Sequence, residues 1–314
     1  MRKRMHLFAR WIAGLAIALV ALALQPASAK GAPQAARAAE RNLPAIKYDG
    51  SRAVTLHYGD LAVTIDGEKS ADPDGRIPVF TGRWRDQVVF SFRLEDAEAP
   101  EPSATAEVVR LDPRTSAPQV VMTAFTFGAH CCTLTRIATL VAPDEWRVLD
   151  AAELDGEGYR FIDIDNDGAR ELVSFDNVFL YAFDSYGSSF APTRIAKLSG
   201  SDIDDVTAEP KYRPFLRRKV QEMEAEARRN PDLWHSNGFL GGWVAAKSLI
   251  GEVDDAWKRM LASYDRTSDW PLEECTSGAE AEQCPKDKLR KVSFPQALKK
   301  LLADNDYPTP KAAR

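Results

Sequence analysis

Histidine is scarce in this sequence, and the patterns on which most histidine-dependent enzymes rely are missing. The 314 residues contain four histidines, of which His57, His130 and His235 lie beyond the first 29 residues. None of these three stands in a nucleophile elbow or in a zincin helix pattern. The Cys-x-x-Cys spacing of thiol oxidoreductases is absent as well. The sequence therefore favours a protein that is not an enzyme.

An excess of basic residues is also missing, and this counts against nucleic acid as a partner. The formal net charge is −5, and it becomes −9 without residues 1–29, which carry four basic side chains and no acidic one. Binding to a phosphate backbone depends on a basic patch. We therefore expect no nucleic-acid partner, whereas protein and glycan partners both remain open. An acidic surface suits solubility and divalent cations.

Long apolar runs are absent except at the N-terminus. Residues 11–24 form a nearly unbroken apolar run, which is shorter than the roughly 20 residues that a membrane-spanning helix needs. Basic residues precede this run, and Ala27-Ser28-Ala29 follows it as a signal-peptidase motif. We expect residues 1–29 to be a signal peptide. The protein would then be periplasmic or secreted, with no membrane span after cleavage.

The rest of the sequence divides into a β-rich part and a helical part. Residues 30–45 lack β-branched and aromatic side chains and are expected to form a flexible lead-in. Residues 46–200 contain short strand-like runs separated by Asp, Gly and Pro turns, which predicts an antiparallel sandwich, barrel or partial propeller. The runs are Ala53–Tyr58, Leu61–Ile65, Ile77–Thr81, Gln87–Leu94, Thr105–Leu111, Gln119–Phe127, Cys132–Val141, Glu171–Phe175, Val178–Phe183 and Arg194–Leu198.

Residues 210–314 change to a helical period, so the expected fold class is α+β. Apolar side chains recur at helical spacing in four segments, and Trp243 and Trp257 are expected in the helix-packing core. The segments are Phe215–Arg229, a helix from Phe239 to near Gly251, Val253–Tyr264, and a last helix containing Phe294, Leu298, Leu301 and Leu302.

The most specific pattern is an Asp-rich segment in the β-rich part. Aspartates stand at alternate positions, Gly168 allows a sharp turn after them, and a glutamate follows. Calcium takes about six to eight oxygen ligands from carboxylates, backbone carbonyls and water. The spacing therefore predicts a calcium site, with an Asp-rich turn that holds no ion as the alternative. The expected ligands are Asp163, Asp165, Asp167, the carbonyl of Ala169, and Glu171.

The segment is not an EF-hand, because an EF-hand closes with a glutamate at position twelve, where this chain has Ser174. It resembles instead the FG-GAP/VCBS-type repeat, which carries Asp-x-Asp-x-Asp-Gly-x-x-Asp/Glu-Leu between two strands. The resemblance covers residues 159–198 and implies that the loop binds calcium. Only one clear copy is present, since Asp202-Ile-Asp204-Asp205 lacks the glycine and the closing acid. The propeller architecture and the adhesive role of integrins therefore do not follow.

Four cysteines in an oxidising compartment predict disulfides. Cys275 and Cys284 enclose a short polar segment and are expected to pair, which would stabilise the fold by about 2–3 kcal/mol. Cys131 and Cys132 are adjacent, in a Gly-Ala-His-Cys-Cys stretch that looks similar to one in other exported bacterial proteins.

Three interpretations of the adjacent cysteines remain open. They are a vicinal disulfide, which the sequence favours, a soft-metal or redox site beside His130, and a cross-link to the helical part. Neighbouring side chains of a strand point to opposite faces, so both thiols can serve one metal only at a bend, which Gly128 could provide.

Two functional hypotheses follow. The first is an exported, non-catalytic, calcium-binding β protein that acts as a binding or structural module of the cell envelope. The second is a periplasmic enzyme or a thiol or metal redox protein that uses His130, Cys131 and Cys132.

Overall fold

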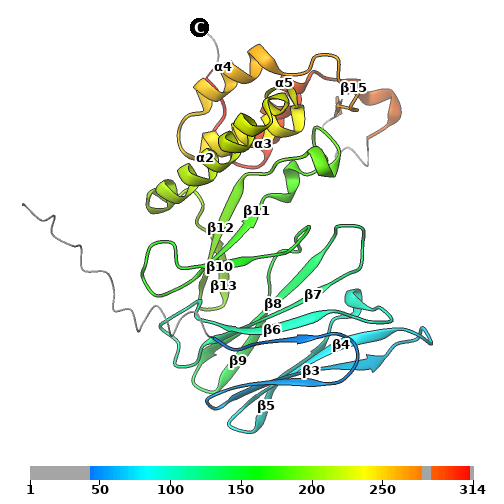
Figure 1. Ribbon diagram of the computed structural model, residues 1–314, viewed down its shortest axis with the longest axis vertical. Helices are drawn as coiled ribbons and strands as arrows, with labels where there is room; N and C mark the ends of the chain where they lie inside the picture. Colours follow the sequence, from blue (N-terminus) through cyan, green and yellow to red (C-terminus); the bar gives the residue numbers. More distant parts are fainter. Residues whose placement is uncertain (1–42, 278–283, 312–314) are drawn as a thin grey trace, which may run out of the picture. The chain divides into compact units, whose positions relative to one another are not determined.

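The computed structural model describes residues 43–277 and 284–311, and Figure 1 shows their arrangement. The expected signal peptide and most of the expected lead-in lie outside the described residues. The lead-in boundary at residue 45 is corrected, because strand β1 (Ala45–Tyr48) begins there and pairs antiparallel with β6.

The first sheet is an antiparallel meander in the order β2-β3-β4-β5. Its side chains alternate between the two faces, as in β3, where Leu61, Val63 and Ile65 are almost fully buried. A turn at Gly59, whose φ of 58° is left-handed, joins the first two strands. The strands are β2 (Val54–Tyr58), β3 (Leu61–Lys69), β4 (Arg76–Trp84) and β5 (Gln87–Arg93).

The second sheet, in the order β1-β6-β7-β8-β9, is covered on both faces. Val120 and Met122 of β7 belong to the core shared with the first sheet, whereas Val121 belongs to a core shared with the third. Burial on both faces explains why the β7 sequence is a nearly continuous apolar run. The remaining strands are β6 (Ala104–Val109), β7 (Gln119–Phe125), β8 (Thr133–Ala142) and β9 (Glu145–Asp150).

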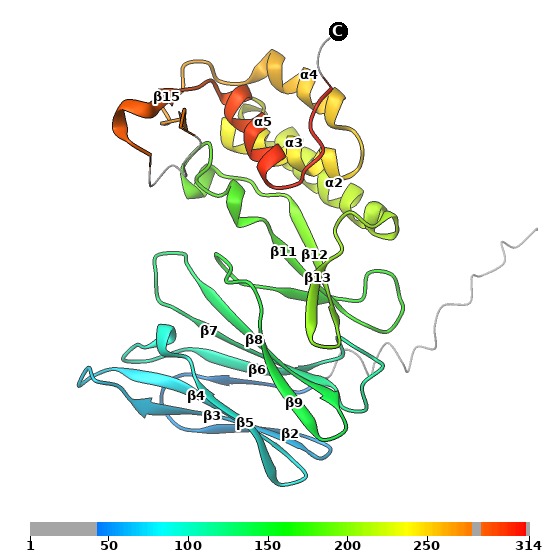
Figure 2. The ribbon, with the colours of Figure 1, turned by 180° about the vertical axis from the view of Figure 1, so that it is seen from behind.

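The third sheet, in the order β10-β11-β12-β13, lies between the second sheet and the helices, as Figures 1 and 2 show. Leu172 and Leu198 pack toward the second sheet, and Val173 and Ile195 pack toward the helices. The strands are β10 (Arg160–Ile162), β11 (Glu171–Phe175), β12 (Thr193–Ser199) and β13 (Asp202–Asp205).

The helical part contains four α-helices and a small hairpin within the described residues. Trp243 is buried in its core and Trp257 packs against that core, as the sequence predicts. In the described part of the chain, no helix combines the length and apolar character that crossing a bilayer requires. The elements are α2 (Arg213–Arg229), α3 (Asn237–Leu249), α4 (Val253–Ser263), α5 (Phe294–Asp304), and strands β14 (Glu273–Cys275) and β15 (Leu289–Lys291).

The predicted α+β class is confirmed: stacked antiparallel sheets precede the helices, and the described residues form no closed barrel. The expected strand Val178–Phe183 is wrong. Residues Asn177–Phe179 form a 3-10 turn, which begins where the side chain of Asp176 accepts a hydrogen bond from the Val178 N–H. Phe179 and Phe183 instead pack into the helical core. These two phenylalanines therefore reflect packing against helices rather than strand pairing.

The contact between α3 and the segment that follows β11 generates a prediction about stability. A Cβ on Gly242 would lie 2.0 Å from the carbonyl oxygen of Phe190. In a helix, alanine is normally more stabilising than glycine. Here, however, the added Cβ would force the backbone of Phe190 to move, so we expect Gly242→Ala to destabilise the fold by about 1–3 kcal/mol. Urea unfolding measures the effect. Gly187→Ala is the control because its Cβ meets open space. A Gly242→Ala protein as stable as wild type would contradict this packing.

Candidate functional site

The Asp-rich loop joins two paired strands of the third sheet. Strand β10 ends at Ile162, which lies opposite Glu171 at the start of β11. Between them the chain turns through two left-handed residues, Asn166 with φ of 60° and Gly168 with φ of 87°. A Cβ on Gly168 would meet nothing within 4 Å, so glycine is favoured there by its backbone conformation rather than by lack of space.

Hydrogen bonds within the loop orient its carboxylates. Asp163 accepts from the N–H groups of Asp167 and Gly168, at 3.1 and 3.3 Å. Asp165 accepts from the Asp167 N–H at 3.3 Å, and Asp167 accepts from the Ala169 N–H at 2.8 Å. The loop backbone thereby turns the carboxylates inward.

Three of the predicted ligands converge. One carboxylate oxygen from each of Asp163, Asp165 and Glu171 lies within 4.8 Å of the others. Asp167 belongs to the same loop but directs Oδ2 to a lysine at 2.6 Å. Ala169 is fully buried beside them. The structure thus brings three of the five expected ligands together, and Asp167 and Ala169 lie in the same loop.

Glu171 is the most constrained member of the group. Its side chain is fully buried, Oε2 accepts from the Ile164 N–H at 2.8 Å, and Oε1 accepts from the Tyr212 hydroxyl at 3.0 Å. Burial, opposed by these hydrogen bonds and reinforced by the charge of Asp165, raises the pKa of Glu171. A positive charge in the loop would therefore favour its ionised form.

Two lysines from outside the loop contact its carboxylates. Lys197 of β12 lies 2.6 Å from Asp167 Oδ2 and 3.6 Å from Glu171 Oε1. Burial opposes ionisation of Asp167, but the hydrogen bonds from Lys197 and from the Ala169 N–H outweigh it and lower the pKa of Asp167. Lys211, 2.9 Å from Asp165 Oδ2, has a raised pKa chiefly because of that hydrogen bond.

The donor set fits a hard divalent cation. Four carboxylates face two ammonium groups, which leaves a formal charge of −2 when all are ionised. All converging donors are oxygens, as calcium requires, and no sulfur or imidazole enters the group. The same arrangement would suit a soft metal poorly.

A second cluster surrounds His130. Its Nδ1 lies 3.1 Å from Asp155 Oδ1, and its Nε2 lies 2.7 Å from the hydroxyl of Tyr181. The ring of Tyr186 stacks on the imidazole with centroids 4.0 Å apart. The sequence draws attention to His130 because it precedes the adjacent cysteines, but no spacing rule identifies Asp155, Tyr181 or Tyr186 as its partners.

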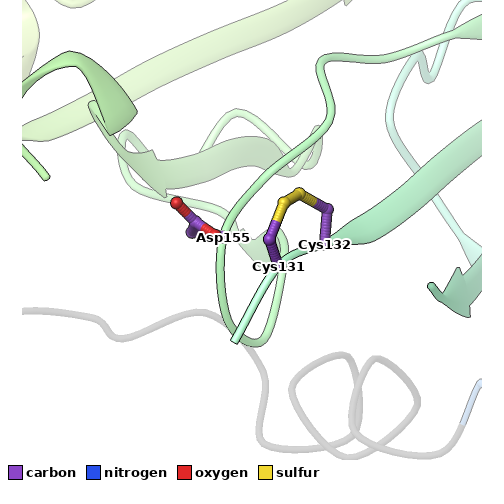
Figure 3. A group of neighbouring side chains, drawn as sticks. All are labelled: Cys131, Cys132 and Asp155. Atoms are coloured by element: carbon purple, nitrogen blue, oxygen red, sulfur yellow. A yellow bond between two sulfur atoms is a disulfide. The ribbon is translucent and has the colours of Figure 1, made fainter. Parts of the chain in front are cut away.

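The adjacent cysteines lie beside this histidine. The structure joins Cys131 to Cys132 in the segment between β7 and β8, and Figure 3 shows Asp155 next to the pair. The Cys132 N–H donates to Thr126 Oγ1 at 2.7 Å, which fixes the backbone there. A Cβ on Gly128 would lie 2.2 Å from the carbonyl oxygen of Cys131, so the glycine is needed for this bend.

The other two cysteines lie in the helical part. The structure places Cys275, at the end of β14, and Cys284 with Cα atoms 5.8 Å apart and joins them. Thus neither member of the vicinal pair is cross-linked to this region.

A cavity of about 550 Å³ lies between the third sheet and the helices. Asp155 and Tyr186 of the histidine cluster stand at its wall. Most of the remaining lining is apolar and comes from β10, β11, α2 and α3, including Ile162, Val173, Leu216, Met223, Ala246 and Leu249. The cavity therefore offers an apolar chamber next to a polar cluster.

Comparison with known proteins identifies one family. The model of the family described as the sll0997 C-terminal domain matches residues 216–306, which cover most of the helical part. No solved structure matches the chain.

Two curated relatives extend the similarity to the β-rich part. The uncharacterized protein y4bJ of Sinorhizobium fredii is 38% identical over 276 residues, which cover 87% of this chain and 43% of that protein. The probable thylakoid lumen protein sll0997 of Synechocystis is 34% identical over 259 residues, which cover 80% of this chain and 75% of that protein. The chain thus spans less than half of the first relative and three quarters of the second.

The buried bond from Tyr212 to Glu171 generates a prediction about stability. Tyr212→Phe keeps the ring, over which the Lys211 ammonium lies at 4.7 Å, and removes only the hydroxyl. A buried carboxylate oxygen then loses a donor, so we expect a loss of about 1–3 kcal/mol in the free energy of unfolding. Tyr58→Phe, on a more exposed strand position, should stay within about 0.5 kcal/mol of wild type. Equal effects of the two substitutions in urea unfolding would exclude a special role for the Tyr212 hydroxyl.

Proposed function

The chain belongs to the family of the probable thylakoid lumen protein sll0997, and from this premise we propose that it is an exported, calcium-stabilised β protein without catalytic activity. It would act as a binding or structural module of the cell envelope, in the periplasm or after secretion. The relative's name refers to a lumen, and the N-terminal residues of this chain have the pattern of a signal peptide. Two cysteine pairs suit an oxidising compartment.

The observation that carries the proposal is the convergence of carboxylate oxygens in the loop between β10 and β11. The residues that would hold the ion are Asp163, Asp165, Asp167, the Ala169 carbonyl and Glu171. When bound, calcium would supply a double positive charge and a shared set of oxygen contacts. The resemblance of the segment to an FG-GAP/VCBS-type repeat supports the same ion.

The place of the loop in the fold indicates what the ion would stabilise. Glu171 begins β11, the strand that pairs with both β10 and β12. Its Oε1 accepts a hydrogen bond from the hydroxyl of Tyr212, which directly precedes α2. Fixing Glu171 therefore holds the third sheet and the first helix of the helical part together. We propose that calcium sets the rigidity of this junction, and that a protein or glycan partner binds elsewhere on the module.

Calcium removal provides the direct test of this proposal. Calcium at about 100 times its Kd should add about 2.7 kcal/mol to the stability of the folded protein, a rise of several degrees in Tm over a chelator-treated sample. Asp163→Asn should abolish most of this rise. Asp204→Asn is the matched control, because Asp204 lies on the neighbouring β13 outside the loop. The proposal fails if the melting curve of the wild-type protein is the same with EDTA and with calcium.

The contact of Lys197 with the loop gives a second test. Its ammonium group, 2.6 Å from Asp167 Oδ2, would compete with calcium for that oxygen and repel it. Lys197→Met should therefore tighten calcium binding, by about three- to tenfold at low ionic strength and by less at high salt. Lys300→Met removes a charge on α5 that pairs with Asp304 and should leave the affinity unchanged. Calorimetric titration with calcium compares the variants, and weaker binding by Lys197→Met would show that the lysine supports the site.

A further inference from the structure

The adjacent cysteines direct both sulfur atoms to the same side of the chain. They stand at a bend between β7 and β8, where Phe127 is left-handed and Gly128 lies against the Cys131 carbonyl. In a regular strand, neighbouring side chains point to opposite faces, which would prevent two adjacent cysteines from binding one metal ion. This restriction does not apply at the bend. Two sulfurs that can be joined in the oxidised state are also placed to serve one ion in the reduced state.

Asp155 supplies a third donor from a different segment. One carboxylate oxygen of Asp155 and the two sulfur atoms all lie within 4.8 Å of one another. Figure 3 shows the three side chains. Donors around a tetrahedral zinc ion are about 3.6–3.8 Å apart, given Zn–S and Zn–O bonds of about 2.3 and 2.1 Å. Reduction breaks the S–S bond, so the two sulfurs can move apart to this spacing while Asp155 already lies within reach of them.

The neighbours of Asp155 resemble the outer shell of a metal site. His130 contacts its Oδ1 at 3.1 Å and is itself held by the Tyr181 hydroxyl and the Tyr186 ring. Outer hydrogen-bond partners of this kind orient metal-binding carboxylates and raise their affinity. Asp155 also lines the 550 Å³ cavity, so the metal site would lie at the edge of this cavity rather than within a closed core.

We infer that reduction of the Cys131–Cys132 disulfide turns this corner into a zinc site formed by two thiolates and the Asp155 carboxylate, with His130 as a positioning residue. An external dithiol would provide the two electrons and two protons, and would itself become a disulfide. Binding of Zn²⁺ by the two new thiols then releases their two protons. The oxidised pair has no thiolate and does not bind the ion.

The mixed donor set selects zinc among the common ions. Thiolates exclude calcium and magnesium, which require oxygen ligands. A carboxylate is a poor ligand for copper(I), which prefers sulfur alone. Zinc accepts thiolate and carboxylate together and tolerates water at its remaining position.

Cobalt(II) provides the probe, because thiolate ligands give it a charge-transfer absorption in the near ultraviolet. The full-length protein is titrated with cobalt before and after reduction by a phosphine, with excess calcium to occupy the loop site. We expect the absorption only after reduction, saturation at one ion per chain, and displacement by zinc. Reduced protein that shows no such absorption, or shows it only after losing its native circular dichroism, overturns the inference.

Variants assign the ligands. Cys131→Ser combined with Cys132→Ser should abolish the absorption although Cys275 and Cys284 remain, and retention of the absorption would place the site on that other pair.

Asp155→Asn should weaken cobalt binding by at least about tenfold. His130→Gln should weaken it by about tenfold without moving the absorption, because the sulfur ligands stay. Unchanged affinity in Asp155→Asn overturns the assignment. Asp163→Asn should leave the cobalt titration unaffected, which separates this inference from the calcium proposal.

Discussion

The buried carboxylate of Glu171 is the interaction on which the junction between sheet and helices depends. A charged group without exposure to water is costly unless hydrogen bonds and opposite charges surround it. Here the Ile164 N–H, the Tyr212 hydroxyl and the ammonium of Lys197 share that role. The two hydrogen-bond donors are in the loop and in the residue that precedes α2, and the ion-pair partner Lys197 lies on β12, 3.6 Å from Oε1. The carboxylate thus adds a polar link between these three segments to the apolar core that packs β11 and β12 against α2.

The layered sheets explain why polar groups gather where they do. The second sheet is covered on both faces, and the third sheet lies between it and the helices, so the strand residues that form the cores between these layers are apolar. Most polar residues of the two candidate sites lie on the connections between strands, and Glu171 and Lys197 lie on the strands beside the Asp-rich loop. The Asp-rich loop connects β10 to β11, and His130 and Asp155 come from the connections that precede β8 and β10. A rigid scaffold holds both clusters, which is a condition for metal ligands to keep their geometry.

Local patterns in the sequence predict the parts of the structure that depend on local interactions. The Asp-rich loop can be recognised in the sequence because its carboxylates are close together along the chain, and the four helices can be recognised because each has an apolar face. The strand predicted over Val178–Phe183 is wrong because Phe179 and Phe183 pack on helices that come later in the chain. Strands β10 and β13 are too short, and β13 too acidic, to be recognised without their partners. Asp155, Tyr181 and Tyr186 meet His130 only through tertiary folding, so spacing could not reveal them.

The central claim is that the loop binds calcium through Glu171 together with the aspartates. Isothermal titration of the calcium-free protein and of Glu171→Gln, which keeps the size of the side chain and can still accept the Tyr212 hydrogen bond, tests it most directly. The account predicts one calcium ion per wild-type chain and a large loss of affinity in the variant. Absence of calcium binding in the wild-type protein, or equal affinity in the two proteins, would contradict it.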